Sequence, residues 1–224
     1  MKLINNAIIM AAGRGTRMLP LTKKIPKAMM TYKNSTLISN GIRKLKKNID
    51  NIHITVGHKG SILAKHVIEN NVSTIINTHK KGNAWWIFNS FLKYLNEPII
   101  VLTCDNVVDI NYDKIEKDYI DKKKPLCMLI PVKPIEYLQG DYIEHKKNIV
   151  TSLSRIKKQD IYCSGIQIIN PFKINKQFKN ERDFNKLWIK MIKKEKLYVS
   201  DVMPKKWFTS DNPKQLKILQ KKNI

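Results

Sequence analysis

The feature that most constrains the fold is a regular alternation between short apolar runs and helical patterns in the first half of the chain. Runs of β type occupy 7–11, 52–56, 72–76 and 99–103. Apolar residues between these runs recur at helical spacing, as in Leu37, Ile38, Ile42 and Leu45, in Ile62, Leu63 and Val67, and in Trp86, Ile87, Phe91 and Leu95. Strands that alternate with helices are typical of a parallel sheet covered on both faces. We therefore predict an α/β fold with a Rossmann-like mixed, mostly parallel sheet.

The second half of the chain has another pattern, although no linker-like break precedes it. A fifth apolar run covers 126–132, and short strands and turns follow Pro134. The sequence then predicts a helix near 183–194, a strand near 197–199 and a last helix from Pro213. This half is expected to form an insertion or lid that completes a site beside the parallel sheet.

Size and cysteine content restrict the class of protein. With 224 residues and 42% apolar content, the chain is long enough for one sizeable core and too short for two, so we predict a single domain over 1–224. Cys104, Cys127 and Cys163 are odd in number and lie in apolar runs, which favours reduced thiols over disulfides or a zinc site. No apolar run reaches about 18 residues, and the apolar start is too short for a secretion signal. We expect a cytoplasmic monomer or homodimer without a membrane partner.

The charge balance is strongly basic but carries no clear binding pattern. Lys and Arg together number 42 against 18 Asp and Glu, a formal net charge of +24. Such a charge attracts polyanions, and a nucleic-acid binder is therefore one alternative. Only five of the 42 cations are Arg, the residue that base recognition favours, and the lysines occur in almost every segment. We interpret the charge as a generally basic surface and expect no specific nucleic-acid partner.

The stretch AAGRGTRMLPLTKKIPK, residues 11–27, follows the first buried strand and is called the opening loop below. Open α/β sheets bind their ligands at the carboxyl ends of strands. Small residues and glycines allow the backbone to approach a ligand and turn its N–H groups toward an anion. The loop is neither a Walker A sequence nor a dinucleotide-binding GxGxxG. A phosphate-binding loop of another kind is predicted.

The opening loop resembles the signature loop of the sugar-1-phosphate nucleotidylyltransferases, in which a glycine-rich turn, an arginine, Pro-Leu-Thr and Pro-Lys recur at this spacing. The resemblance is to small single-domain members, such as the N-acetylmuramate-1-phosphate uridylyltransferase-like and hexose- or heptose-1-phosphate guanylyltransferase-like proteins. The resemblance implies that Arg17 neutralises the phosphates and that Lys27 contacts the α-phosphate and the incoming phosphate. It also implies a nucleotide-binding set made of Ala11, Ala12, Gly13, Gly15, Thr16 and Arg17.

A triphosphate site of this kind uses Mg²⁺, because a hard cation bridging phosphates neutralises much of their charge and prefers carboxylate oxygens. Asp105 lies just past the apolar run 99–103, at the same sheet edge as the opening loop. The family's metal-binding aspartate follows the corresponding strand. We therefore predict that Arg17, Lys27 and Asp105 form the catalytic set, with Asp105 on the metal.

Further residues are assigned through the same resemblance. Gly82 and Asn83 stand where the family has a turn that contacts the nucleobase, and Asn83 is also expected to cap the helix that follows it. Gly140, Ser164 and Gly165 lie in segments similar to the family's sugar-phosphate side. Together with Lys27 they are the predicted acceptor-binding residues.

The end of the chain departs from the family pattern. The similar members carry Trp-x-Asp-x-Gly-Thr there, and the aspartate is the second metal ligand. This chain has Trp207 followed by Thr209 at the acid position. Asp211 is the predicted substitute ligand after a local bulge; otherwise it would cap the helix that begins at Pro213.

The resemblance implies a nucleotidyltransferase that joins a nucleoside triphosphate to a sugar 1-phosphate and releases pyrophosphate, giving an NDP-sugar for polysaccharide synthesis. Residues 1–133 would bind the nucleotide and 134–224 the acceptor. Two alternatives stay open besides the nucleic-acid binder. A cytidylyltransferase for phosphocholine or another phosphorylated non-sugar would share the opening loop, and a non-catalytic nucleotide-binding protein would explain Thr209.

Overall fold

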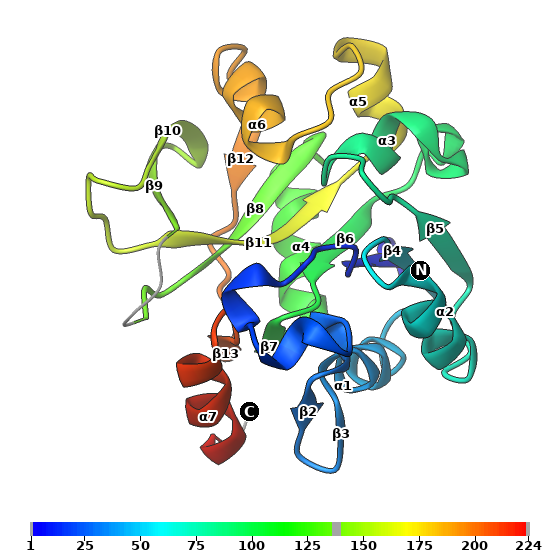
Figure 1. The fold of residues 1–224 in the computed structure, drawn as a ribbon. Helices are drawn as coiled ribbons and strands as arrows, with labels where there is room; N and C mark the ends of the chain where they lie inside the picture. Colours follow the sequence, from blue (N-terminus) through cyan, green and yellow to red (C-terminus); the bar gives the residue numbers. More distant parts are fainter. Residues whose placement is uncertain (1, 136–139, 223–224) are drawn as a thin grey trace.

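The structure is a computed structural model that describes residues 2–135 and 140–222. Its main element is a nine-stranded mixed sheet in the order β5-β4-β1-β6-β11-β8-β12-β10-β9 (Figure 1). The strands are β1 (Asn6–Met10), β4 (Asn51–Val56), β5 (Thr74–Asn77), β6 (Ile99–Thr103), β8 (Cys127–Val132), β9 (Asp141–Lys146), β10 (Ile149–Ser154), β11 (Tyr162–Ile169) and β12 (Leu197–Val199). Two small antiparallel sheets pair β2 (Thr31–Tyr32) with β3 (Ser35–Thr36) and β7 (Asn106–Asp109) with β13 (Lys206–Thr209).

The first four strands of that order, β5, β4, β1 and β6, are parallel to one another. β11 then lies antiparallel between β6 and β8, so the second half of the chain extends the same sheet. The expected insertion is thus built largely from strands of the main sheet. The α/β fold with a mixed sheet, predicted from the alternating runs, is confirmed. The predicted division at residue 133 stays a prediction.

Helices cover both faces of the sheet. They are α1 (Leu37–Leu45), α2 (Gly60–Ile68), α3 (Trp85–Asn89), α4 (Tyr112–Asp121), α5 (Pro171–Gln177), α6 (Phe184–Ile192) and α7 (Pro213–Lys221). Because side chains alternate along a strand, Ile9 packs with α1, α2 and α4, whereas Ile8 packs with α3, α5 and α6. In Figure 1, α3, α5 and α6 lie together beyond β11 and β8. Two apolar cores, one on each face, hold the carboxyl ends of β1 and β6 in place.

Polar side chains cap the first turns of four of the longer helices. Thr36, Asn111, Asp183 and Asn212 each accept a hydrogen bond from a backbone N–H in the first turn of α1, α4, α6 and α7. Each such cap stabilises a helix by about 1 kcal/mol. α7 begins at Pro213, as predicted, and Asn212 rather than Asp211 is its cap. Asp211 is therefore available for other contacts.

The pattern from Trp86 to Leu95 does not form one helix. α3 ends at Asn89 and is followed by the 3₁₀ helix η4 (Phe91–Tyr94). Ser90 separates them, because its backbone is extended and its hydroxyl both donates to the Trp86 carbonyl and accepts from the Leu92 N–H. Trp86 in α3 is buried and packs in the core on this face of the sheet.

A third apolar cluster joins the opening loop to the end of the chain. Met18 in the 3₁₀ helix η1 (Thr16–Met18) packs in one cluster with Val107 of β7, Phe208 of β13 and Leu216 of α7. Burying each of these side chains contributes about 1.5–3 kcal/mol. The segment between β13 and α7 is thereby held beside the opening loop.

Cys127 and Cys163 are buried and Cys104 is partly buried, and all are free thiols, which agrees with the predicted absence of disulfides. Among the residues that the structure describes, no helix is both long and apolar enough to cross a membrane.

Candidate active site

Two adjoining cavities open at the carboxyl ends of β1 and β6. The main cavity has a volume of about 650 Å³ and the side cavity about 710 Å³. Met10, Gly13, Arg17 and Thr103 line both. Gly13, Lys27 and Asp105 all line the main cavity, so the three residues on which the sequence interpretation depends are brought together.

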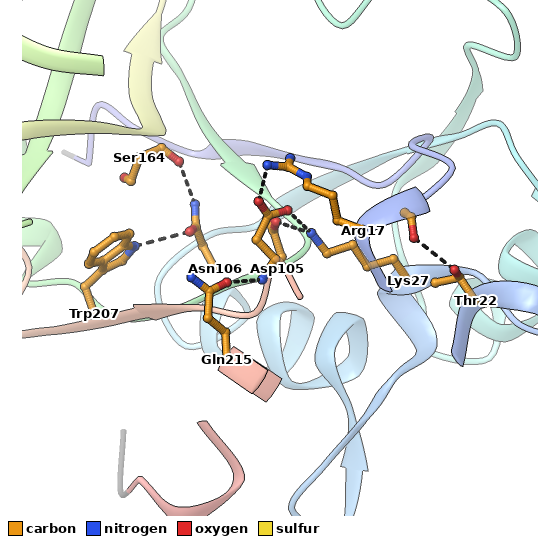
Figure 2. Close-up of polar contacts among 10 residues, drawn as sticks. Arg17, Thr22, Lys27, Asp105, Asn106, Ser164, Trp207 and Gln215 are labelled. Atoms are coloured by element: carbon orange, nitrogen blue, oxygen red, sulfur yellow. Dashed lines mark hydrogen bonds and ion pairs between the residues drawn. The ribbon is translucent and has the colours of Figure 1, made fainter. Parts of the chain in front are cut away.

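The opening loop is shaped by one glycine with a left-handed backbone. Gly15 has φ of 63° and ψ of 39°, a conformation that side chains with a Cβ disfavour. A Cβ at this position would lie 2.9 Å from Cβ of Lys27 and 3.0 Å from Cγ2 of Thr22. The Thr22 hydroxyl donates to the Gly15 carbonyl at 2.9 Å (Figure 2). The turn therefore holds the Lys27 stem against the loop backbone.

Lys27 begins the 3₁₀ helix η3 (Lys27–Met29), and its ammonium lies between two carboxylates (Figure 2). Nζ is 2.5 Å from Oδ2 of Asp105 and 2.9 Å from Oδ1 of Asp211. Burial lowers the pKa of Lys27, but the charge of Asp105 and the hydrogen bonds to both acids more than offset this, so its pKa lies above the ordinary value. The side chain is a fixed cation at any physiological pH.

Asp105 follows Cys104 in the turn between β6 and β7. Burial raises the pKa of the Asp105 carboxyl. The charge and the hydrogen bond of Lys27 lower the pKa by more than burial raises it, so the pKa lies below its usual value. Burial raises the pKa of the neighbouring Cys104 thiol to about 12, and the thiol stays neutral. The acid at this sheet edge is thus an anion held by Lys27.

Asp211 reaches the same cluster without the predicted bulge. β13 pairs with β7 in regular register, with Thr209 opposite Asn106, and the Ser210 N–H then donates to the Asp105 carbonyl at 3.1 Å. The next residue, Asp211, turns toward Lys27, and Arg17 Nη1 lies 2.5 Å from its Oδ2. Its backbone N–H donates to Oε1 of Gln215 at 2.8 Å (Figure 2). The expectation of a bulge was wrong.

These two acids form the candidate metal site. Their carboxylate oxygens meet on a single cationic nitrogen, and carboxylate oxygens are what a hard divalent cation prefers. In the described part of the chain, no cluster of three or more His, Cys, Asp or Glu side chains could hold a metal. Asp105 and Asp211 fit an ion of the Mg²⁺ type that takes its remaining ligands from phosphates and water.

The side cavity contains the other nucleotide-binding candidates. Ala12, Gly82 and Asn83 line it, together with His58 and the cationic turn of His79, Lys80 and Lys81. The expected cap of α3 by Asn83 was wrong, because its Oδ1 accepts instead from the Phe184 N–H of α6 at 2.8 Å. Gly82 packs against the Arg182 backbone, where a Cβ would lie 1.8 Å from the carbonyl oxygen. The turn is fixed by contact with α6.

Ala11 differs from the rest of the predicted set. It is buried, lines neither cavity, and its N–H donates to the carbonyl and hydroxyl of Thr55 in β4. Gly15 and Thr16, by contrast, line the main cavity with Arg17.

The predicted acceptor residues Gly140, Ser164 and Gly165 line the main cavity opposite the opening loop. The Ser164 hydroxyl is buried and has no hydrogen-bond partner in the described structure. Gly165 has φ of +84°, which a side chain would strain.

Sequence reasoning missed several residues of this wall. Asn106 Nδ2 donates to the Ser164 carbonyl at 3.0 Å, and Trp207 Nε1 donates to Asn106 Oδ1 at 3.2 Å (Figure 2). Asp141 and Arg155 also line the cavity. The tandem Asp105-Asn106 was the one signal in the sequence that could have pointed to Asn106.

The mixed sheet with helices on both faces is the class of fold found in solved nucleotide-diphospho-sugar transferases. A solved structure of this class, the inositol-1-phosphate CTP transferase from T. maritima, matches with a TM-score of 0.79 at 17% identity, over 97% of this chain and 94% of that one. The profile of the nucleotidyl transferase family matches residues 6–140, more than half of the chain. The chain belongs to the nucleotidyl transferase family.

Two curated relatives support the same family over shorter stretches. The bifunctional protein GlmU of Methanococcus aeolicus is 27% identical over 114 residues, which are 50% of this chain and 28% of the relative. The CTP:phosphoglutamine cytidylyltransferase of Campylobacter jejuni is 43% identical over 63 residues, 28% of this chain and 25% of the relative. The aligned parts thus span about a quarter of the length of these relatives.

Proposed function

We propose that this protein transfers a nucleotidyl group from a nucleoside triphosphate to the phosphate of a small acceptor and releases pyrophosphate. The observation that carries the proposal is the convergence of Arg17, Lys27, Asp105 and Asp211 beside the glycine turn in one cavity. Transfer at phosphorus requires two anions to be positioned in line while charge develops on the leaving group. Fixed cations and backbone amides at the cavity wall suit that requirement.

In this proposal the amides around Gly13, Gly15 and Thr16 bind the triphosphate, and Arg17 turns from Asp211 toward the leaving phosphates. Arg17 is free to turn because its side chain is 69% exposed. Lys27 orients the α-phosphate and the incoming phosphate. An acceptor phosphate oxygen forms a bond to the α-phosphorus as the bond to the pyrophosphate oxygen breaks. A phosphate monoester is largely dianionic at pH 7, so no general base is needed.

Asp105 and Asp211 would hold Mg²⁺, which supplies charge neutralisation on the phosphates when bound. Lys27 now occupies the space between these carboxylates. Its ammonium is therefore expected to shift toward the phosphates when the acids take a divalent ion.

A reaction that consumes nucleoside triphosphates also implies a cytoplasmic location.

The acceptor class has two candidates. A sugar 1-phosphate is the first, as implied by the family resemblance. A phosphorylated non-sugar is the second, because the name of one relative specifies phosphoglutamine as its substrate and CTP as its donor. The base of the nucleoside triphosphate stays open for both acceptor classes.

The test is a screen of the four nucleoside triphosphates against sugar 1-phosphates and phosphocholine, with Mg²⁺, read out as pyrophosphate release. At least one pair is expected to turn over, and Lys27→Ala and Asp105→Ala are expected to stay folded and lose most of the rate. Thermal stabilisation by a triphosphate with no turnover of any pair would favour a non-catalytic binder. Steeply salt-dependent retention of any oligonucleotide would favour the nucleic-acid alternative.

A further inference from the structure

The end of the main cavity away from the opening loop contains a second pair of opposite charges. Asp141 is the first residue of β9 and lies across from Cys163 of β11. Its Oδ1 accepts from Nε of Arg155 at 3.1 Å, just beyond the end of β10. The Asp141 side chain is 16% exposed and that of Arg155 is 70% exposed. The acid is therefore part of the cavity wall, while its partner lies mostly in solvent.

Acids are enriched in this cavity relative to the chain. Overall, 18 Asp and Glu stand against 42 Lys and Arg. Among the described residues, the charged ones that line the cavity are three acids and three cations, namely Asp105, Asp141, Asp211, Arg17, Lys27 and Arg155. Asp105 forms an ion pair with Lys27, and Asp211 forms ion pairs with Lys27 and Arg17. Asp141 is the remaining acid, and no step of the proposed reaction uses it.

Aromatic rings join the two ends of the cavity. Asn106, next to Asp105, fixes the Trp207 indole through the hydrogen bond to its Nε1. The Trp207 ring lies 6.1 Å from that of Tyr162, which in turn lies 5.7 Å from Tyr142, the neighbour of Asp141. Trp207 and Tyr162 line the cavity. A wall of π surface thus leads from the candidate metal site to the Asp141 carboxylate.

A carboxylate next to aromatic rings is complementary to a positively charged nitrogen, through charge-assisted hydrogen bonding and cation–π attraction. A neutral sugar hydroxyl can also donate to a carboxylate, but it gains neither the charge-assisted nor the cation–π attraction. The contact with Arg155 is a weak competitor, because an ion pair with a mostly exposed partner contributes little.

We propose that Asp141 is the counter-ion for an ammonium group on the acceptor, so that the acceptor is a phosphorylated small molecule carrying a positively charged nitrogen. Its phosphate lies toward Lys27 and its nitrogen toward Asp141, with Trp207 and Tyr162 along its length. This inference rests on the proposed nucleotidyl transfer and narrows its acceptor class.

The experiment compares two acceptors that differ in charge alone at one end, phosphoethanolamine and 2-hydroxyethyl phosphate, with glucose 1-phosphate as the sugar probe. Each is assayed with the four triphosphates by pyrophosphate release. Phosphoethanolamine is expected to have a kcat/KM about 10–100-fold above that of 2-hydroxyethyl phosphate, the size of effect that a hydrogen bond between charged groups produces. The difference is expected mainly in KM, because the nitrogen is remote from the reacting phosphorus.

Asp141→Asn tests the counter-ion directly, since it keeps the shape of the side chain and removes its charge. The variant is expected to lose the preference for phosphoethanolamine and to keep its rate with 2-hydroxyethyl phosphate. Glu144→Gln is the matched control. Glu144 lies on the same strand, pairs with Lys157 and does not line the cavity, so its neutralisation should leave both acceptors unchanged.

Two results would separate this inference from the proposed function. Turnover of glucose 1-phosphate or 2-hydroxyethyl phosphate in preference to phosphoethanolamine would overturn the ammonium inference alone, as would an equal loss with both acceptors in Asp141→Asn. Absence of pyrophosphate release with every acceptor, despite triphosphate binding, would contradict the transfer reaction itself and the inference with it.

Discussion

Lys27 and Lys122 each lie between two aspartates, but of the two only Lys27 lines the main cavity. Lys27 joins Asp105 and Asp211, which are 78 and 184 residues away in the sequence. Lys122 contacts Asp118 one helical turn earlier in α4 and Asp201 beyond β12. Both lysines have a pKa above the ordinary value, because burial lowers the pKa less than the neighbouring acids raise it. The two charge arrangements are therefore similar.

The difference lies in what else contacts the acids. Asp118 also accepts from the Ser200 hydroxyl and the Asp201 N–H, so its oxygens are occupied within the protein. Asp105 and Asp211 instead line a cavity, where an ion or a phosphate can approach them. An ion cluster whose donors are all internal stabilises the fold, whereas one open to a cavity can exchange partners with a ligand.

The largest expected effect comes from removing each lysine in turn. Lys27→Ala is expected to reduce turnover about 100-fold or more, since it removes a fixed cation from the phosphates. Lys122→Ala is expected to change turnover by less than about twofold. Pyrophosphate release, with the donor and acceptor pair that the screen identifies, is the measurement.

Stability serves as the control for that pair. Lys122→Ala leaves the Asp118 carboxylate without its cation and is expected to lower the free energy of unfolding by about 1–3 kcal/mol. Urea unfolding measures this loss. Wild-type turnover in a folded Lys27→Ala protein would contradict the prediction that only the Lys27 cluster takes part in turnover.

Neutralising the second acid of each cluster is expected to change turnover less than removing the lysine does. Asp211→Asn is expected to weaken Mn²⁺ binding and to lower turnover by about 10–100-fold, as the loss of a metal-site group does. Asp201→Asn is the control, because Asp201 is 67% exposed and does not line the main cavity. Electron paramagnetic resonance of free Mn²⁺ measures the affinity without any turnover. Unchanged Mn²⁺ binding in Asp211→Asn would remove this residue from the metal site.

The smallest effect concerns acid stability. The folded-state pKa of Asp105 lies below its unfolded value of about 3.9, so its contribution is present above that pH and is lost as the pH falls through the lowered pKa. From pH 5 to pH 3, wild type should lose more stability than Asp105→Asn does. Thermal melts over this range test the sign. A steeper loss in the variant would contradict it.

The parallel part of the fold could be predicted because its signals are local. Each apolar run becomes a strand within one or two residues, and the glycine turn follows β1 as a contiguous pattern. Gly13, Lys27 and Asp105 could be placed at one edge since parallel strands bring their carboxyl ends together. The membership of these residues in one cavity follows from that rule.

The acceptor side could not be predicted in the same way, because its geometry depends on non-local antiparallel pairing. The register of β9 against β11 places Asp141 beside Cys163, and nothing in either segment alone specifies it. Asn106 accepts a hydrogen bond from Trp207 and donates one to Ser164, and these bonds likewise join residues 101 and 58 positions apart. Asn83 was misassigned for a similar reason, since its partner Phe184 belongs to the other half.

Asp105 and Asn106 are covalent neighbours with different contacts, one facing Lys27 and the other holding Trp207. Consecutive Cα atoms are about 3.8 Å apart across a trans peptide, whatever the rest of the protein does. Covalent geometry therefore fixes the backbone spacing between the acid proposed to bind the ion and the amide that holds the indole. Relatives with this tandem that accept shorter or longer molecules would have to vary the β9–β10 hairpin instead.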